Sequence, residues 1–263
     1  MKKNCVKKAL AWLLTVLQLL ACTALADTVT EVRTSVFSAM TYAGGYTVRF
    51  LDMNGDEIYQ VTDVDYATPM DGLFSKLLEE HPEYTTVVWS VTGDYRVLNN
   101  AEVFMQPENA IARVGGKVYP TLQAAIDADE TAEGSTVLLM ADTNENIDTK
   151  GKSFTLDMGG HTLTAGQVGA RAYTQMGGTV TVMQGTITGA YTADTWNEPG
   201  KGAGMYVKDG SLTARYMTIQ GNTSRYEGGG LHGNGSAIVL DNCSITGNTD
   251  YYNGGGGVYV KGG

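Results

Sequence analysis

The sequence has little proline and comparatively few basic side chains. Five prolines occur in 263 residues, without a Gly-X-Y period, which excludes a collagen-like chain. Eighteen Lys and Arg stand against 28 Asp and Glu, giving a net charge of −10. Nucleic acid is therefore not expected as a partner, because phosphate binding needs a basic patch. The 34 glycines are instead abundant, and most of them follow Gly159.

Residues 1–26 have the pattern of an export signal. Four lysines within the first eight residues precede an apolar stretch, residues 9–21, that is too short to span a bilayer comfortably. Ala24-Leu25-Ala26 forms a small-x-small cleavage site that would leave Asp27 as the first residue. We therefore predict a signal peptide and a secreted or cell-surface protein.

An alternative processing site uses Leu19-Leu20-Ala21-Cys22, which resembles the lipobox of lipoproteins and would attach a lipid to Cys22. Contact with a membrane is expected only through the export signal or through this lipid. Under ordinary cleavage Cys243 is the only cysteine left, so no internal disulfide framework is predicted. Cys243 lies in a strand pattern and is interpreted as a small buried hydrophobic residue.

Residues 27–43 are polar and are interpreted as a linker, with one strand allowed at 29–36. The alternation of residues 46–51 and the Asn54-Gly55 turn predict a β-hairpin whose return strand is 57–61. Further strands are predicted at 84–89 and 101–104. Together with the helix described next, they give the order ββαββ and a small α+β module over residues 44–110.

The predicted helix of this module begins at Thr68, with Thr68 as the N-cap and Pro69 at the first helical position. Apolar residues then recur at helical spacing and define one buried face. These residues are Met70, Leu73, Phe74, Leu77 and Leu78. Pro82 is expected to end the helix.

The module contains the segments Tyr46-Thr-Val-Arg-Phe-Leu-Asp52, Asn54-Gly55, Trp89-Ser90 and Thr92-Gly93-Asp94. In these residues it resembles the small β-grasp-type repeats of bacterial surface proteins. The resemblance implies a role in spacing or docking, without chemistry.

The hairpin turn also carries the oxygen spacing of a calcium loop. Asp52, Asn54, Asp56 and Asp63 occupy positions 1, 3, 5 and 12 of such a loop. Position 6 requires glycine for the sharp turn, but here it is Glu57. We therefore expect polar turn residues rather than a metal site, and no cofactor is predicted anywhere in the chain.

Residues 111–164 contain three segments of note: Val114-Gly-Gly-Lys-Val-Tyr-Pro-Thr-Leu-Gln-Ala-Ala-Ile-Asp127, Thr136-Val-Leu-Leu-Met140 and Phe154-Thr-Leu-Asp-Met-Gly-Gly-His-Thr-Leu163. Together they resemble the entry segment of pectate-lyase-like β-helix proteins. Thr121 is predicted to cap a short helix whose apolar face covers the open end of the strand stack. That face consists of Leu122, Ala125 and Ile126.

Repeats beyond residue 164 predict the same architecture. Two sets of equivalent apolar residues recur, one at spacings of 32 and 26 residues and the other at spacings of 26 and 27, with apolar and polar residues alternating around them. The sets are Ile187, Ile219 and Ile245, and Met205, Leu231 and Val258. We predict a mainly β chain whose residues 111–263 form a right-handed parallel β-helix solenoid that is incomplete at the C-terminus.

The corners of the predicted coils carry glycine and asparagine. Glycine clusters at 228–230 and 254–257 permit positive φ. Asn222 and Asn248 are predicted at equivalent corners, in left-handed conformation and with stacked amides, a ladder that Ala190 interrupts. The pairing of Ile-x-Gly-Asn with a Gly-rich run is also similar to the repeats of polymorphic membrane proteins, which are adhesins.

No tight pair of carboxylates marks a catalytic centre. Outward charged residues do not recur in register, which leaves Asp209 and Asp241 as weak catalytic candidates beside Arg215 and Glu227. His161 and His232 have no acidic partner nearby in the sequence, so corner roles are expected for both. Aromatic residues in the loops could stack on sugar rings and are the ligand-binding candidates. They are Trp196, Tyr226, Tyr251 and Tyr252.

Two functions follow from these patterns. The first is an adhesive, structural or glycan-binding surface protein whose partners are extracellular glycans or host surface ligands. The alternative is a polysaccharide lyase or glycoside hydrolase whose active site lies in further C-terminal coils. The fold alone favours neither.

Overall fold

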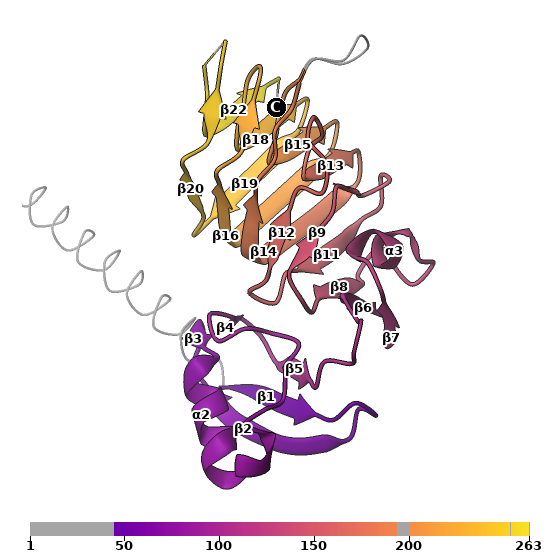
Figure 1. The fold of residues 1–263 in the computed structure, drawn as a ribbon, viewed down its shortest axis with the longest axis vertical. Helices are drawn as coiled ribbons and strands as arrows, with labels where there is room; N and C mark the ends of the chain where they lie inside the picture. Colours follow the sequence, from indigo (N-terminus) through magenta and orange to yellow (C-terminus); the bar gives the residue numbers. More distant parts are fainter. Residues whose placement is uncertain (1–44, 194–199, 253, 263) are drawn as a thin grey trace, which may run out of the picture.

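The computed structural model describes residues 45–193, 200–252 and 254–262, and it is mainly β. A small module with one α-helix lies at one end, and rows of strands continue away from it toward the C-terminus (Figure 1). Within these residues no helix is long and apolar enough to cross a membrane. The predicted signal peptide, the predicted linker and Trp196 lie outside the described residues.

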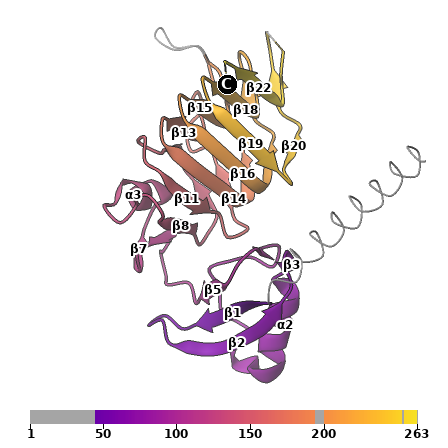
Figure 2. The ribbon, with the colours of Figure 1, turned by 180° about the vertical axis from the view of Figure 1, so that it is seen from behind.

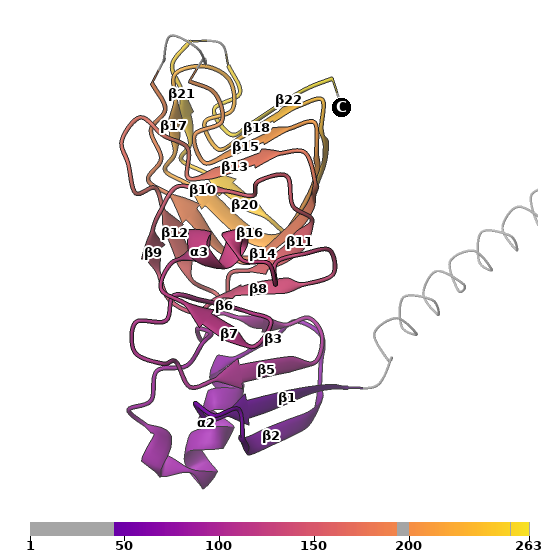
Figure 3. The same ribbon diagram turned by 90° about the vertical axis from the view of Figure 1, so that its right-hand side faces the viewer.

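The module is built on a three-stranded sheet in the order β2-β1-β5. β1 (Tyr46–Leu51) and β2 (Glu57–Val64) form the predicted antiparallel hairpin, and β5 (Ala101–Phe104) pairs with β1 in parallel. Helix α2 (Asp71–Glu80) lies against this sheet (Figure 3). Its buried Leu73 and Leu77 belong to the same apolar cluster as the strands. The hairpin, the helical face and the strand at 101–104 are thus confirmed.

The predicted start of the helix is wrong. Thr68 and Pro69 form strand β3, which pairs with β4 (Arg96–Val97) in antiparallel orientation. The Thr68 hydroxyl donates a hydrogen bond to the Asp65 carbonyl oxygen (2.8 Å). The N-cap is Met70, which has no capping side-chain bond.

The predicted strand at 84–89 is also wrong. Pro82–Tyr84 form a 3₁₀ turn (η1), and only Trp89 makes a bridge, with Met105. Trp89 instead contacts the core through its ring, whose centroid lies 5.5 Å from that of Phe50. Pro82 fixes the chain in a turn, and the strand propensity of the following residues is not used.

Residues 112–261 contribute two larger sheets. The main path of the ten-stranded sheet consists of β19 (Ala237–Asp241), β16 (Ser211–Gln220), β14 (Thr179–Thr188), β11 (Phe154–Asp157), β8 (Thr136–Leu139), β6 (Ala112–Val114) and β7 (Lys117–Tyr119). Its short flanking strands are β9 (Thr143–Asn144), β12 (Thr162–Thr164) and β20 (Ser244–Thr246). The five-stranded sheet consists of β10 (Ile147–Asp148), β13 (Tyr173–Met176), β15 (Met205–Lys208), β18 (Leu231–Asn234) and β22 (Val258–Lys261). From β8 to β19 and from β10 to β22, neighbouring strands pair in parallel.

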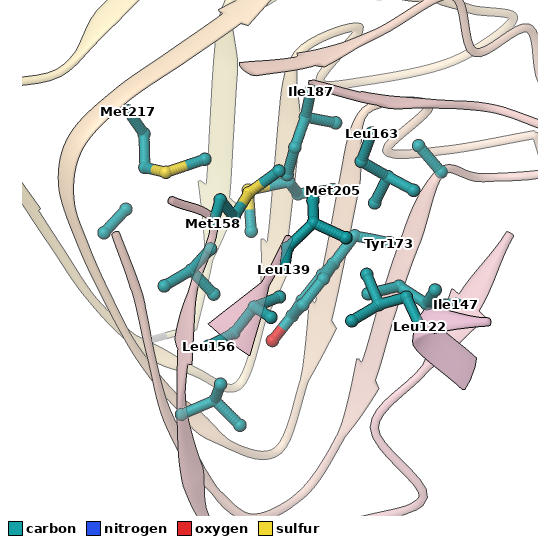
Figure 4. Packing of buried hydrophobic residues seen from close by; sticks show 14 of the residues in the cluster. Leu122, Leu139, Ile147, Leu156, Met158, Leu163, Tyr173, Ile187, Met205 and Met217 are labelled. Atoms are coloured by element: carbon teal, nitrogen blue, oxygen red, sulfur yellow. The ribbon is translucent and has the colours of Figure 1, made fainter. Parts of the chain in front are cut away.

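The predicted register of these strands is confirmed at every equivalent position. Ile187 pairs with Ile219, and Ile219 with Ile245. Met205 pairs with Leu231, and Leu231 with Val258. Four of these side chains belong to one buried apolar cluster, and those of Ile245 and Val258 pack against it. Ile187 and Met205 are labelled in Figure 4. Because strand side chains alternate faces, the intervening residues point outward.

Helix α3 (Leu122–Asp127) forms where the sequence predicts it, and its apolar face belongs to this cluster. Thr121 accepts a hydrogen bond from the Ala124 amide (3.0 Å), and Leu122, Ala125 and Ile126 are fully buried. A second cap was not predicted: the Glu145 carboxylate accepts from the amides of Leu122 and Gln123, at 2.8 and 3.0 Å. A carboxylate at this end complements the helix dipole.

The asparagine ladder is present, but its predicted backbone conformation is wrong. The Asn222 side chain donates to Asn248 Oδ1 (3.1 Å) and accepts from the Ala190 amide (3.1 Å). The positive φ belongs to the preceding residues, Gly221 (63°) and Gly247 (62°). The two asparagine side chains therefore bond to backbone groups of the preceding repeat, which we call the neighbouring row. The glycine before each asparagine adopts the positive φ of the turn.

The module lies directly below the ten-stranded sheet in Figure 2, and hydrogen bonds join the two. The Thr92 amide donates to the Gly159 carbonyl (2.8 Å), and the Arg96 amide donates to Gln184 Oε1 (2.7 Å). The Tyr95 hydroxyl donates to the buried Asp157 carboxylate (3.1 Å). Burial raises the pKa of Asp157 to about 6, and hydrogen bonds from Gly159 and Tyr95 oppose that rise.

Candidate functional site

Exposed aromatic side chains gather beside the short parallel pair β17 (Thr223–Ser224) and β21 (Thr249–Asp250). A bridge from Tyr191 to Thr223 adds a third row. Residues that follow equivalent positions in parallel rows are brought side by side. The tyrosine cluster defined by this geometry consists of Tyr191, Arg225, Tyr226, Tyr251 and Tyr252.

The cluster forms a shallow depression of about 360 Å³ lined by Tyr191, Arg225, Tyr251 and Tyr252. These three tyrosines are 40%, 61% and 63% exposed, respectively. The rings of Tyr226 and Tyr252 lie 5.4 Å apart, and the Arg225 guanidinium carbon lies 5.3 Å from the Tyr252 ring centroid. Aromatic faces and a guanidinium therefore meet on one solvent-facing surface.

Three of the four predicted ligand-binding residues, Tyr226, Tyr251 and Tyr252, are thus brought together. The fourth, Trp196, lies outside the described residues. Tyr191 and Arg225 were not predicted. Arg225 directly precedes Tyr226, and Tyr191 directly follows Ala190, the residue that occupies the asparagine position of its row. Placing the rows beside one another would have revealed both residues.

The two weak catalytic candidates are not brought together. Asp209 lies in the turn between β15 and β16, with φ of 54°, whereas Asp241 lies at the end of β19. The Asp241 carboxylate forms an ion pair with Arg215 Nε at 3.2 Å. A pair of carboxylates positioned across a glycosidic bond is not formed by these residues.

Both histidines have a carboxylate beside them in the structure, although none was identified nearby in the sequence. The buried His232 ring is stacked between Tyr206 and Tyr259, 5.4 Å from each, and its Nε2 lies 3.3 Å from Glu227. Glu227 also forms an ion pair with Lys201 (2.5 Å). Burial lowers the pKa of His232, so the neutral imidazole is favoured. Glu227 is only five positions from His232, but a Gly-rich turn folds it back.

His161 lies at the contact between the module and the sheet. Its ring nitrogens lie 3.5 Å from Asp142 Oδ1 and 3.3 Å from the Ser90 carbonyl oxygen. Burial lowers the pKa of His161. Cys243 is half-buried, and its thiol donates to the Ala214 carbonyl oxygen (3.3 Å). Burial raises the pKa of this thiol, which disfavours the reactive thiolate.

The four weak metal candidates are split between the two ends of the hairpin. Asp52 closes the turn by accepting from the amides of Asn54 (2.8 Å) and Asp56 (2.9 Å). Asp63 lies at the far end of β2, beside Gly45. Within the described part of the chain, no three His, Cys, Asp or Glu side chains are grouped to hold a metal ion.

Comparisons with models of protein families, with curated proteins and with solved structures found no match to this chain.

Proposed function

We propose that this chain is an exported cell-surface protein that binds extracellular glycans. The basic, apolar and small-residue pattern of residues 1–26 supports export. The in-register parallel rows of residues 136–261 support a right-handed parallel β-helix, in which each coil presents the same outward positions as its neighbours. Such a repetitive face suits an adhesive or structural surface protein.

The observation that carries the proposal is the tyrosine cluster. A pyranose ring has an apolar face of C–H groups that packs on an aromatic ring, and hydroxyls at its edge that accept hydrogen bonds. Tyr251 and Tyr252 offer exposed rings, and the Arg225 guanidinium lies beside the Tyr252 ring. Large exposed aromatics are otherwise unfavourable on a soluble surface, so their grouping indicates a ligand.

The experiment is glycan binding by the secreted protein, measured on an array and then by calorimetry with the best ligand. Tyr252→Ala should weaken binding at least about tenfold, while the melting temperature stays unchanged. Tyr66→Ala is the matched control, because Tyr66 is also an exposed tyrosine (44%) but lies in the module. Equal affinities for the wild type and Tyr252→Ala would contradict the proposal.

The same incubation distinguishes binding from cleavage. A binding protein leaves the glycan intact, and chromatography should show no shorter products. Release of oligosaccharides that is abolished by Asp241→Ala or Asp209→Ala would instead indicate a polysaccharide lyase or glycoside hydrolase.

A further inference from the structure

A cleft of about 710 Å³ separates the module from the outer face of the ten-stranded sheet. One wall comes from β1 and β5 of the module, and the other from the β6–β7 hairpin, β8 and β11. The volume lies within the range of small-molecule binding sites. No residue lines both this cleft and the tyrosine cluster.

Most of the charges that line this cleft are already paired. Arg49 forms ion pairs with Glu57 (2.7 Å) and Glu102 (2.8 Å). Asp157 accepts hydrogen bonds from the Tyr95 hydroxyl (3.1 Å) and the Gly159 amide (3.0 Å). These groups therefore need no ligand.

Arg113 is the exception. Its guanidinium carbon lies 3.8 Å from the centroid of the Phe104 ring, which covers one face of the group. Within the described residues no carboxylate lies within ion-pair distance of Arg113, and Glu102 acts on it only from farther away. Burial lowers the pKa of Arg113, which reflects the loss of solvent around its charge. A half-buried guanidinium with free N–H donors is complementary to a planar or tetrahedral oxyanion.

We propose that this cleft binds the oxyanion of an acidic saccharide, with Arg113 donating to a carboxylate or sulfate group. The exposed side chains of Asn99 and Thr136 line the same cleft and supply amide and hydroxyl groups for the sugar hydroxyls. The saccharide part of this inference rests on the proposed function, whereas the oxyanion part rests on Arg113. The site is separate from the tyrosine cluster, so the two can be tested independently.

The test is calorimetry at low ionic strength with three disaccharides of equal size: one carrying a carboxylate, one carrying a sulfate and one neutral. The affinity for an acidic disaccharide should fall at least about tenfold in Arg113→Gln. The affinity of the wild type for the neutral disaccharide should be no higher than the affinity of Arg113→Gln for the acidic one. Arg215→Gln is the control. Arg215 is in register with Arg113 across the strands of the ten-stranded sheet, but it is paired with Asp241. The carboxylated and sulfated ligands together show which oxyanion is preferred.

Arg113→Lys guards against misfolding, because it keeps the charge and the aliphatic stem but loses the bidentate fork. Its melting temperature should match the wild type, with a smaller loss of affinity than in Arg113→Gln. Ligand-induced amide shifts in NMR should fall on Asn99 and Thr136, and Tyr252→Ala should leave them unchanged. Wild-type affinity in Arg113→Gln, equal affinity for the neutral disaccharide, or shifts confined to the tyrosine cluster would overturn the proposal. Failure of the proposed function alone would instead appear as Tyr252→Ala without effect on any glycan, while the Arg113 result holds.

Discussion

The small module and the parallel-stranded region bury apolar residues in different ways. The module core is aromatic and irregular. The rings of Phe50, Phe74 and Trp89 contact one another, and the sequence around them does not repeat. The parallel-stranded region repeats aliphatic side chains, so that Ile187, Ile219 and Ile245 meet their own equivalents in the next row. The module core is therefore built from positions that each occur once, whereas the core of the parallel-stranded region is built from a few positions that recur in successive repeats.

The two kinds of core should differ in how far the destabilisation caused by a substitution extends. In a stack of rows, each row is stabilised mainly by its neighbours, so a defect in a central row removes two interfaces at once. In the module, a defect acts on a single cluster. The two regions are also in contact. Leu138 of the sheet packs against the module core, and the Tyr95 hydroxyl donates a hydrogen bond to Asp157.

The largest effect is expected from Ile219→Asp. Ile219 is fully buried between two rows, and a carboxylate there would be unpaired among apolar side chains, costing about 4 kcal/mol or more. Hydrogen exchange by mass spectrometry should show loss of protection in residues 179–261 before residues 46–104. Thr218→Asp is the matched control, because Thr218 points outward between Thr186 and Ser244. Unfolding of Thr218→Asp alone would reverse the assignment of the inner face.

Asp157→Asn should alter the contact between the two regions. The folded-state pKa of Asp157 is raised to about 6, so the folded chain holds this proton more tightly than the unfolded chain. Its contribution to stability is fully present below about pH 4 and is lost as pH rises through about 6. The neutral amide of the variant would mimic the protonated carboxyl and add up to about 3 kcal/mol at neutral pH.

Urea denaturation of Asp157→Asn and the wild type, compared from about pH 4 to about pH 7, isolates this group from the other carboxylates. The two stabilities should diverge as pH rises. A constant difference across this range would show that Asp157 titrates normally.

Asn222→Ala should act only on the parallel-stranded region. The substitution leaves the Ala190 amide and the Ile187 carbonyl without their partners in a fully buried position, costing about 2 to 3 kcal/mol. Asn248→Ala should cost about 1 kcal/mol, because this row is partly exposed to water that can replace the amide. Thermal melts of the two variants should therefore differ in this order. Equal losses would show that burial does not set the strength of the ladder.

The smallest losses of stability are expected for substitutions at the starts of the helices α3 and α2. Thr121→Ala removes the side-chain cap of α3 and should cost about 1 kcal/mol. Thr68→Ala should cost less than about 0.5 kcal/mol, because Thr68 precedes α2 without capping it. Chemical denaturation of both variants is sufficient. A larger loss in Thr68→Ala would restore the predicted helix start.

Repetition made much of the parallel-stranded region predictable. The equivalence of Ile187, Ile219 and Ile245 appears in the sequence because each row must bury the same face against its neighbour. The cap at Thr121 was predictable for a local reason, since a threonine oxygen needs only the amide three residues later. The hairpin of β1 and β2 followed from its Asn54-Gly55 turn.

The errors arose where a distant segment changed the outcome. Thr68 resembles a helix cap, but pairing of Thr68 with Val97 makes it a strand residue. Residues 84–89 have strand propensity, but Pro82 begins a turn and only Trp89 reaches the sheet. Propensity describes a residue with its immediate neighbours, and pairing across many positions overrides it.

The sequence by itself determined the mainly β character, the register of the rows and the cap of α3, because these depend on periodicity and on contacts close along the chain. Only the tertiary structure decided which side chains share a surface. It joined Tyr191 to Tyr251 and Tyr252 and set Glu227 beside His232. Among the residues that the structure describes, it left Arg113 without a carboxylate at ion-pair distance. Neighbours across rows lie within a few ångströms in space but dozens of positions apart in sequence, so their charges and rings meet only after folding.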